Sequence, residues 1–316
     1  MTLKHKFKIA ALALMLAGTP LAYAEKAKAA SSAVVQQSFA SPEAAAKALA
    51  DAVRAHDNKA IVAIVGPKAR GWLSSGDQVA DQADQQKFLA AYDVKNSIVP
   101  ATDGRAFLLV GADEWPFPAP FVRKGEGWVF DAAAGRDELL NRRIGRNELD
   151  TIQTLLAIVD AQREYAAGDP DGNGFNDYAR RFVSSTGKKD GLYWPVAVGE
   201  SQSPLGPEIG AAAREGYSKA KSGSGKSVAY HGYHYRILTS QGVNAPGGAY
   251  SYLVNDKLIG GFAVLAYPAK YGVSGVMSFL VNHEGVVYEK NLGKETVAAA
   301  EKMRSFSPDS GWKKAQ

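Results

Sequence analysis

Apolar residues recur at helical spacing in three segments near the start of the chain. Residues 41–43 read Ser-Pro-Glu, which is typical of a helix start, and an apolar stripe follows through residue 53. Two further helices are expected over residues 57–65, where Gly-Pro ends the pattern, and 81–95. The pattern therefore predicts three consecutive helices before any strand.

Strand patterns replace the helical ones after residue 105. Residues 106–110 form a compact apolar run, and residues 117–122 and 128–130 flank a Gly-Glu-Gly turn. Helices followed by an antiparallel sheet predict an α+β fold. This order of elements, with the closing hairpin at Trp128 and Phe130, resembles the cystatin-like cone of nuclear transport factor 2-type domains. The resemblance implies a cystatin-like domain over residues 37–145.

A long helix is predicted over residues 136–167, with a bend or break at Gly145 that places the domain boundary there. Short helices are expected at about 176–183 and 206–219, and a final one at 294–304. The predicted strands between them are 233–239, 250–254, 259–266, 277–281 and 286–288. Residues 161–165, 232–237 and 261–264 resemble type IV pilin and pseudopilin heads, which implies a pilin-head-like domain over residues 146–316. A cystatin-like domain stands where pilins carry an apolar helix, which argues against assembly into a pilus.

Several short stretches spread over the chain resemble a bacterial envelope family catalogued as domain of unknown function 2950. The resemblance covers nearly everything after about residue 37 and implies export without implying an activity. The stretches that carry it are 73–77, 115–118, 143–149, 190–195, 203–207, 245–250 and 271–277.

The first residues have the three-part layout of a secretory signal peptide. Lys4, Lys6 and Lys8 precede an apolar run of residues 9–22, and Ala-Tyr-Ala ends at Ala24. We expect cleavage after Ala24, a linker over residues 25–36, and a periplasmic or secreted protein. The alternative is an uncleaved anchor, but the run is short for a bilayer. No later stretch predicts a transmembrane segment.

Composition excludes some functions and weakens others. The 316 residues include no cysteine, which removes disulfides, thiolate nucleophiles and thiolate metal sites. The formal charge of +5 would fall to +2 without the three lysines of residues 1–24. The densest basic run, residues 142–146, is interpreted as the solvated face of a helix. Nucleic-acid binding is therefore not expected.

An acidic loop follows the long helix and suggests calcium. Asp169, Asp171 and Asn173 stand at alternate positions, Phe175 would offer its carbonyl, and Asp177 follows two residues later. Calcium prefers six to eight oxygen ligands on such a tightly turned loop. Arg replaces the Glu expected at the twelfth position, so the loop is not a full EF-hand. The alternative is an acidic turn that caps the next helix.

Aromatic residues alternate with prolines over residues 115–121. Proline cannot donate to a sheet ladder, so this is expected to be an edge strand or a polyproline stretch. Trp115, Phe117 and Phe121 are candidates for binding a partner, either another envelope protein or a cell-wall component. The alternative is that these rings cover the domain's own core.

No complete catalytic motif accompanies these features. Residues 223–227 end like a phosphate-binding loop but lack its first glycine, and residues 272–276 miss the G-x-S-x-G pattern by one position. We therefore expect a non-enzymatic binding protein of the cell envelope with a calcium loop. The alternative is an exported hydrolase or small-ligand-binding protein that uses the cleft of the first domain.

Overall fold

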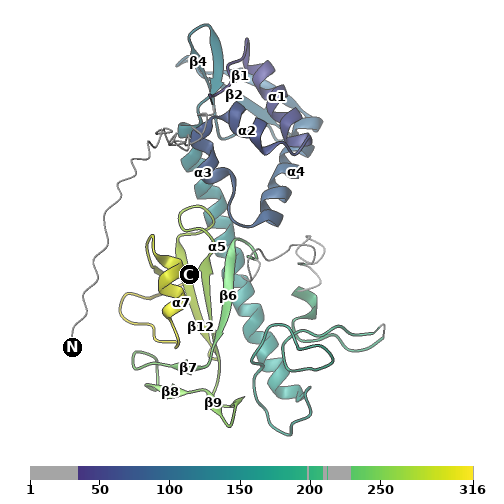
Figure 1. Ribbon diagram of the computed structural model, residues 1–316, viewed down its shortest axis with the longest axis vertical. Coiled ribbons are helices and arrows are strands. Elements are labelled where there is room, and N and C mark those ends of the chain that lie inside the picture. The colour runs from purple at the N-terminus through teal and green to yellow at the C-terminus, as the bar shows by residue number, and fades with distance from the viewer. Residues whose placement is uncertain (1–34, 198, 209–211, 213–228, 316) are drawn as a thin grey trace, which may run out of the picture. The chain divides into compact units, whose positions relative to one another are not determined.

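The computed structural model describes residues 35–197, 199–208, 212 and 229–315 (Figure 1). The fold is a mixture of helices and antiparallel sheets, which confirms the α+β class. The predicted signal peptide, residues 25–34 of the predicted linker and most of the helix expected at 206–219 lie outside the described residues. In the part of the chain that is described, no helix combines the length and apolarity needed to cross a membrane.

Helices open the described chain, and local capping decides where the longest three begin. Ser41, Asp57 and Asp77 each accept hydrogen bonds from backbone amides of the first helical turn. The Asp77 cap starts its helix earlier than the apolar pattern predicts. The helices are α1 (Pro42–Arg54), α2 (Asn58–Val65), the 3-10 turn η1 (Pro67–Ala69), α3 (Arg70–Leu73) and α4 (Gln78–Val94).

The first sheet is antiparallel and packs against these helices. Its order is β1-β2-β4-β5, and β3 pairs with β2 outside that path. Leu108, Phe121 and Phe130 lie in one buried cluster with α1 and α2 residues such as Leu49 and Ile64. The strands are β1 (Asn96–Pro100), β2 (Ala106–Val110), β3 (Trp115–Pro116), β4 (Phe121–Lys124) and β5 (Gly127–Phe130).

Helix α5 (Ala132–Gly168) runs through 37 residues without a break. The break predicted at Gly145 is absent, because the helix continues through this residue. Leu140 belongs to the first buried cluster and Leu155 to a second one, so both ends of the helix are held by packing. Packing of this kind overrides the weak helix propensity of one exposed glycine. The domain boundary at residue 145 stays a prediction.

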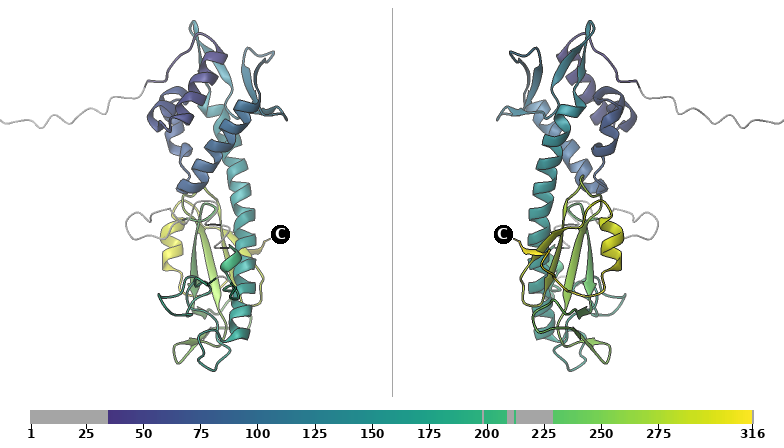
Figure 2. Two further views of the ribbon diagram at one scale, coloured as in Figure 1. Left: turned by 90° about the vertical axis from the view of Figure 1, so that its right-hand side faces the viewer. Right: turned by 90° about the vertical axis from the view of Figure 1, so that its left-hand side faces the viewer.

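The second sheet is also antiparallel and has the order β14-β13-β12-β11-β6. It lies between α5 and α7 (Thr296–Lys302), which explains why β11 and β12 are buried almost throughout (Figures 1 and 2). The strands of this sheet are β6 (Tyr233–Leu238), β11 (Ala263–Pro268), β12 (Met277–Asn282), β13 (Tyr288–Asn291) and β14 (Lys313–Lys314). Two small ribbons are formed by β7 (Ser240–Gln241), β8 (Tyr250–Ser251), β9 (Leu253–Val254) and β10 (Lys257–Leu258).

One predicted helix is replaced by an irregular segment. Residues 176–183 form isolated bridges rather than a helix. The Tyr178 amide donates to the Leu258 carbonyl at 3.0 Å, and the Ala179 amide donates to the buried Gln162 side chain at 2.8 Å. These long-range partners satisfy the backbone, so no local helix is needed.

Hydrogen bonds tie the segment before α4 to loops of the second half. An Asp77 oxygen accepts from the Gly232 amide at 2.9 Å. The Lys270 ammonium donates to the carbonyls of Gly71 at 2.7 Å and Ser74 at 3.2 Å. Residues 73–77 carry part of the family resemblance, and these contacts give that stretch a structural role.

Candidate functional site

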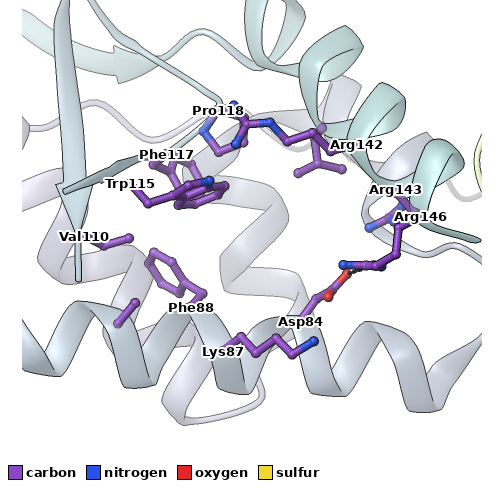
Figure 3. A pocket seen from close by; sticks show the side chains of 12 residues that line it. Asp84, Lys87, Phe88, Val110, Trp115, Phe117, Pro118, Arg142, Arg143 and Arg146 are labelled. Atoms are coloured by element: carbon purple, nitrogen blue, oxygen red, sulfur yellow. Dashed lines mark hydrogen bonds and ion pairs between the residues drawn. The ribbon is translucent and has the colours of Figure 1, made fainter. Parts of the chain in front are cut away.

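A pocket of about 440 Å³ opens between α4, β3 and the first turns of α5 (Figure 3). This volume lies in the range of small-ligand sites. Apolar side chains form one part of its lining and charged side chains the other. The lining residues are Asp84, Lys87, Phe88, Ala91, Val110, Trp115, Phe117, Pro118, Leu139, Arg142, Arg143 and Arg146.

Aromatic residues from two elements form the apolar wall. Phe88 on α4 meets Phe117, with ring centroids 5.4 Å apart. Trp115 on β3 keeps 41% of its surface exposed. The two-residue strand β3 pairs with the end of β2, and the prolines that follow confine this segment to the sheet edge. The edge position leaves part of the Trp115 side chain exposed to solvent and to a ligand.

The charged side of the pocket follows the helical repeat. Asp84 and Lys87 are three residues apart on α4, and Arg142 and Arg146 are four apart on α5, so each pair shares a face. Arg146 pairs with Asp84 at 3.0 Å, which links the two helices. Among the described residues, no hydrogen bond or ion pair engages the Lys87 ammonium.

Arg142 is held in place by two contacts. Its guanidinium pairs with Glu138, one turn earlier on α5, at 2.6 Å. The same group lies over the Trp115 ring, 5.2 Å from its centroid. Arg142 therefore orients Trp115 and has part of its charge neutralised by Glu138.

Arg143 is anchored behind the pocket wall. Its side chain is only 9% exposed, and it donates to the Trp72 carbonyl at 2.8 Å. The Asp81 carboxylate lies 4.0 Å from it and accepts the Ser75 amide with both oxygens. Burial lowers the pKa of Arg143 and raises the pKa of Asp81. Arg143 is thus a fixed structural cation.

The predicted partner-binding aromatics separate into two groups. Trp115 and Phe117 both line the pocket. Phe121 is fully buried, and its ring centroid lies 4.5 Å from that of Phe130 in the core. For Phe121 the alternative prediction therefore holds, namely that the ring covers the domain's own core.

The prediction that the basic run at residues 142–146 forms a solvated helix face holds for Arg142 and Arg146, which are exposed, but not for Arg143, which is buried. Arg142, Arg143 and Arg146 all line the pocket. The sequence held one usable signal, since three cations repeat at helical spacing after an aromatic edge strand. Nothing in the sequence showed that α4 would bring Asp84 opposite them.

The predicted calcium loop leaves the end of α5 in a compact turn. Asp169 accepts the amides of Asn173 at 3.0 Å and Gly174 at 2.9 Å. The Asn173 side-chain nitrogen donates to Asp171 at 2.7 Å and Asp177 at 2.9 Å, and the ring of Phe175 is half exposed. Three of the predicted ligands therefore do converge. Within the described ranges, however, no three histidine or carboxylate side chains form a group that could hold a metal.

Comparison with known proteins identifies a family but no activity. The family described as a protein of unknown function (DUF2950) matches residues 36–315. No curated protein and no solved structure matches the chain.

Proposed function

This chain belongs to the DUF2950 family of proteins of unknown function, and from its own residues we propose that it is an exported binding protein without enzymatic activity. Its pocket holds a small ligand with an apolar body. The observation that carries this proposal is a cavity of about 440 Å³ with aromatic side chains on one wall. Such a wall stabilises a bound ligand by removing apolar surface from water.

The chemistry of the lining favours binding over hydrolysis. The twelve lining residues include no serine, histidine or tyrosine, and their one carboxylate, Asp84, is paired with Arg146. A hydrolase needs a nucleophile or an activated water beside a general base. The sequence left open a hydrolase or a small-ligand-binding protein as the alternative function. Of these two, the pocket supports small-ligand binding.

Binding of an uncharged aromatic probe tests this proposal. N-phenylnaphthylamine should fluoresce on addition of the protein, and Trp115→Ala should weaken its binding by about five- to tenfold because one wall ring is lost. The matched control is Phe175→Ala, since Phe175 is also an exposed ring beside a cation, Lys257, but lies outside the pocket. Equal binding by the two variants, or no binding by the wild type, would contradict the proposal.

Export and the two fold resemblances are further proposals. Export rests on the charged and apolar pattern of residues 4–24, and the amino-terminal sequence of the mature protein tests it. Helices that precede the first sheet support a cystatin-like domain. The packing of α5 against the second sheet supports a pilin-head-like domain. An experimental structure of each half would test these two assignments.

Calcium binding by the loop is a second proposal, favoured by the convergence of Asp171 and Asp177 on Asn173. It requires Asn173 to turn its amide oxygen, in place of its nitrogen, toward the cation.

A partner of this binding protein would be another envelope protein or a cell-wall component.

Millimolar calcium should raise the melting temperature of the wild-type protein. An ion at ten times its Kd adds about 1.4 kcal/mol to the free energy of unfolding. Asp171→Ala should abolish the rise because it removes a ligand oxygen. Asp160→Ala, which removes an exposed carboxylate of α5 outside the loop, should leave the rise unchanged. A melting temperature that does not respond to calcium would eliminate the loop as a site.

A further inference from the structure

We propose that the ligand of this pocket is an amphipathic anion, whose carboxylate or phosphate binds between Lys87 and Arg146. This rests on the proposed function, because the apolar body of the same ligand lies against Phe88 and Trp115. Figure 3 shows the two parts of the pocket, with the aromatic rings at one end and Asp84, Lys87 and Arg146 at the other.

The charges around the pocket leave two cations for a ligand. Four of the lining residues are cations and one is an acid. Arg142 is occupied by Glu138 and Trp115, and Arg143 by the Trp72 carbonyl and Asp81. The remaining cations are Lys87, which has no partner among the described residues, and Arg146, which pairs with Asp84 alone.

Lys87 is positioned to receive an anion. Among the described residues no acceptor engages its ammonium. Its side chain extends along α4 toward Asp84 and Arg146 (Figure 3). An anion placed beside Lys87 would gain a cation that no ion pair among the described residues occupies.

Arg146 is bound to Asp84, but in an exchangeable way. Both side chains are partly exposed, at 45% and 34%, and ion pairs in water of this kind contribute little to stability. The planar guanidinium can bind a carboxylate or phosphate through two parallel hydrogen bonds. The Asp84 carboxylate therefore occupies the position on Arg146 where the ligand anion would bind, and it competes with that anion.

The neighbouring aromatic rings require the ligand to be amphipathic. A purely inorganic anion would leave the wall of Phe88, Trp115 and Phe117 in contact with water. An uncharged hydrocarbon would leave Lys87 without a partner. A ligand with an apolar tail and one anionic group satisfies both ends, and the pocket is large enough for both parts.

Two dyes that differ by one sulfonate provide the central experiment. Anilinonaphthalene sulfonate carries the anion, and N-phenylnaphthylamine is its uncharged counterpart. The wild type should bind the sulfonate at least about fivefold more tightly, and added salt should reduce the difference. Equal affinities would overturn the anion proposal and leave the proposed function standing. Binding of neither dye would overturn the proposed function itself.

Three pocket variants locate the anion site. Lys87→Gln and Arg146→Gln should each weaken sulfonate binding by about five- to tenfold and should weaken binding of the uncharged dye much less. Asp84→Asn should strengthen sulfonate binding by about two- to fivefold because the competing carboxylate is gone. Arg136→Gln is the matched control, an exposed arginine of α5 outside the pocket. If Asp84→Asn bound the sulfonate dye more weakly than the wild type, the proposal that the ligand anion replaces Asp84 at Arg146 would be wrong.

Competition distinguishes the sources of the anion. Dodecanoate and dodecyl phosphate carry the same tail with a carboxylate or a phosphate, and dodecanol carries neither. Displacement of the sulfonate dye by dodecanoate indicates a fatty acid, and stronger displacement by dodecyl phosphate indicates a lipid phosphate. Displacement by dodecanol as strong as that by dodecanoate at the same concentration would overturn the proposal. Melting curves of the variants should nearly coincide with that of the wild type, because Lys87 and Arg146 are exposed and Asp84 is partly exposed.

Discussion

Arg143→Ala should lower the free energy of unfolding by about 2–4 kcal/mol. The Arg143 side chain is 9% exposed and donates to the Trp72 carbonyl at 2.8 Å. Its loss leaves that carbonyl and the Asp81 carboxylate in a site from which water is largely excluded. Breaking a buried pair costs more than the pair contributes, because the remaining charge stays uncompensated.

Arg142→Ala is the matched control for this prediction. Arg142 is the adjacent residue of α5, but its side chain is 43% exposed and its ion pair with Glu138 is a helical i,i+4 contact. Such pairs contribute about 0.3–0.5 kcal/mol. Denaturant unfolding measures both variants, and a similar loss for the two would show that Arg143 is not an anchor.

The effect of Arg143→Ala should depend on pH. Burial raises the pKa of Asp81 in the folded state above its unfolded value, and the charge of Arg143 limits the rise. A raised carboxyl pKa contributes stability below the unfolded pKa, about 3.9, and this is lost as pH rises through the folded pKa. Without Arg143 the Asp81 pKa rises further. The deficit should therefore be smaller at about pH 4 than at pH 7.

Gly135→Ala should lower the free energy of unfolding by about 1–3 kcal/mol, although alanine is the better helix former. A Cβ atom at Gly135 would stand 2.6 Å from the Ala119 Cα atom and 2.8 Å from its amide nitrogen. These are backbone atoms, so the segment before β4 must move away from α5. The same movement displaces Pro118, which lines the pocket.

Gly145→Ala provides the opposite result on the same helix. Nothing lies within 4 Å of a Cβ atom at Gly145, which is exposed. The substitution should raise the free energy of unfolding by about 0.5–1 kcal/mol, because alanine loses less conformational entropy than glycine. Thermal unfolding compares the two variants. Stabilisation by both would show that α5 does not pack closely on Ala119.

Local signals predicted the elements that local chemistry controls. The helix expected over residues 57–65 is α2, because the Asp57 cap and the Gly-Pro that follows act within one turn. The strand expected over residues 106–110 is β2, whose apolar run fits a buried strand. Strand β14 was not expected, since the pattern of Lys313 and Lys314 contains no apolar residue. Pairing with β13 creates it.

The candidate site was predicted only in part, because some of its residues carry a local signal and others are brought together by packing between distant segments. Trp115 and Phe117 were recognised because aromatics between prolines are unusual in a strand. Lys87 and Arg146 were not, because charged residues on a helix are ordinary by themselves. Lys87 and Arg146 line one pocket only because a face of α4 packs beside a face of α5. Such long-range packing leaves no local signal in the sequence.

The sequence by itself determined the α+β class, the starts of α1 and α2 and the aromatic edge strand, because capping and hydrophobic periodicity act over a few residues. The tertiary structure alone decided three things: that α5 continues through Gly145, that Phe121 is core, and that Arg146 meets Asp84. Each depends on contacts between segments far apart in the chain. Burial and pairing at those contacts outweigh local propensity, and they turn an ordinary basic helix face into one side of a pocket.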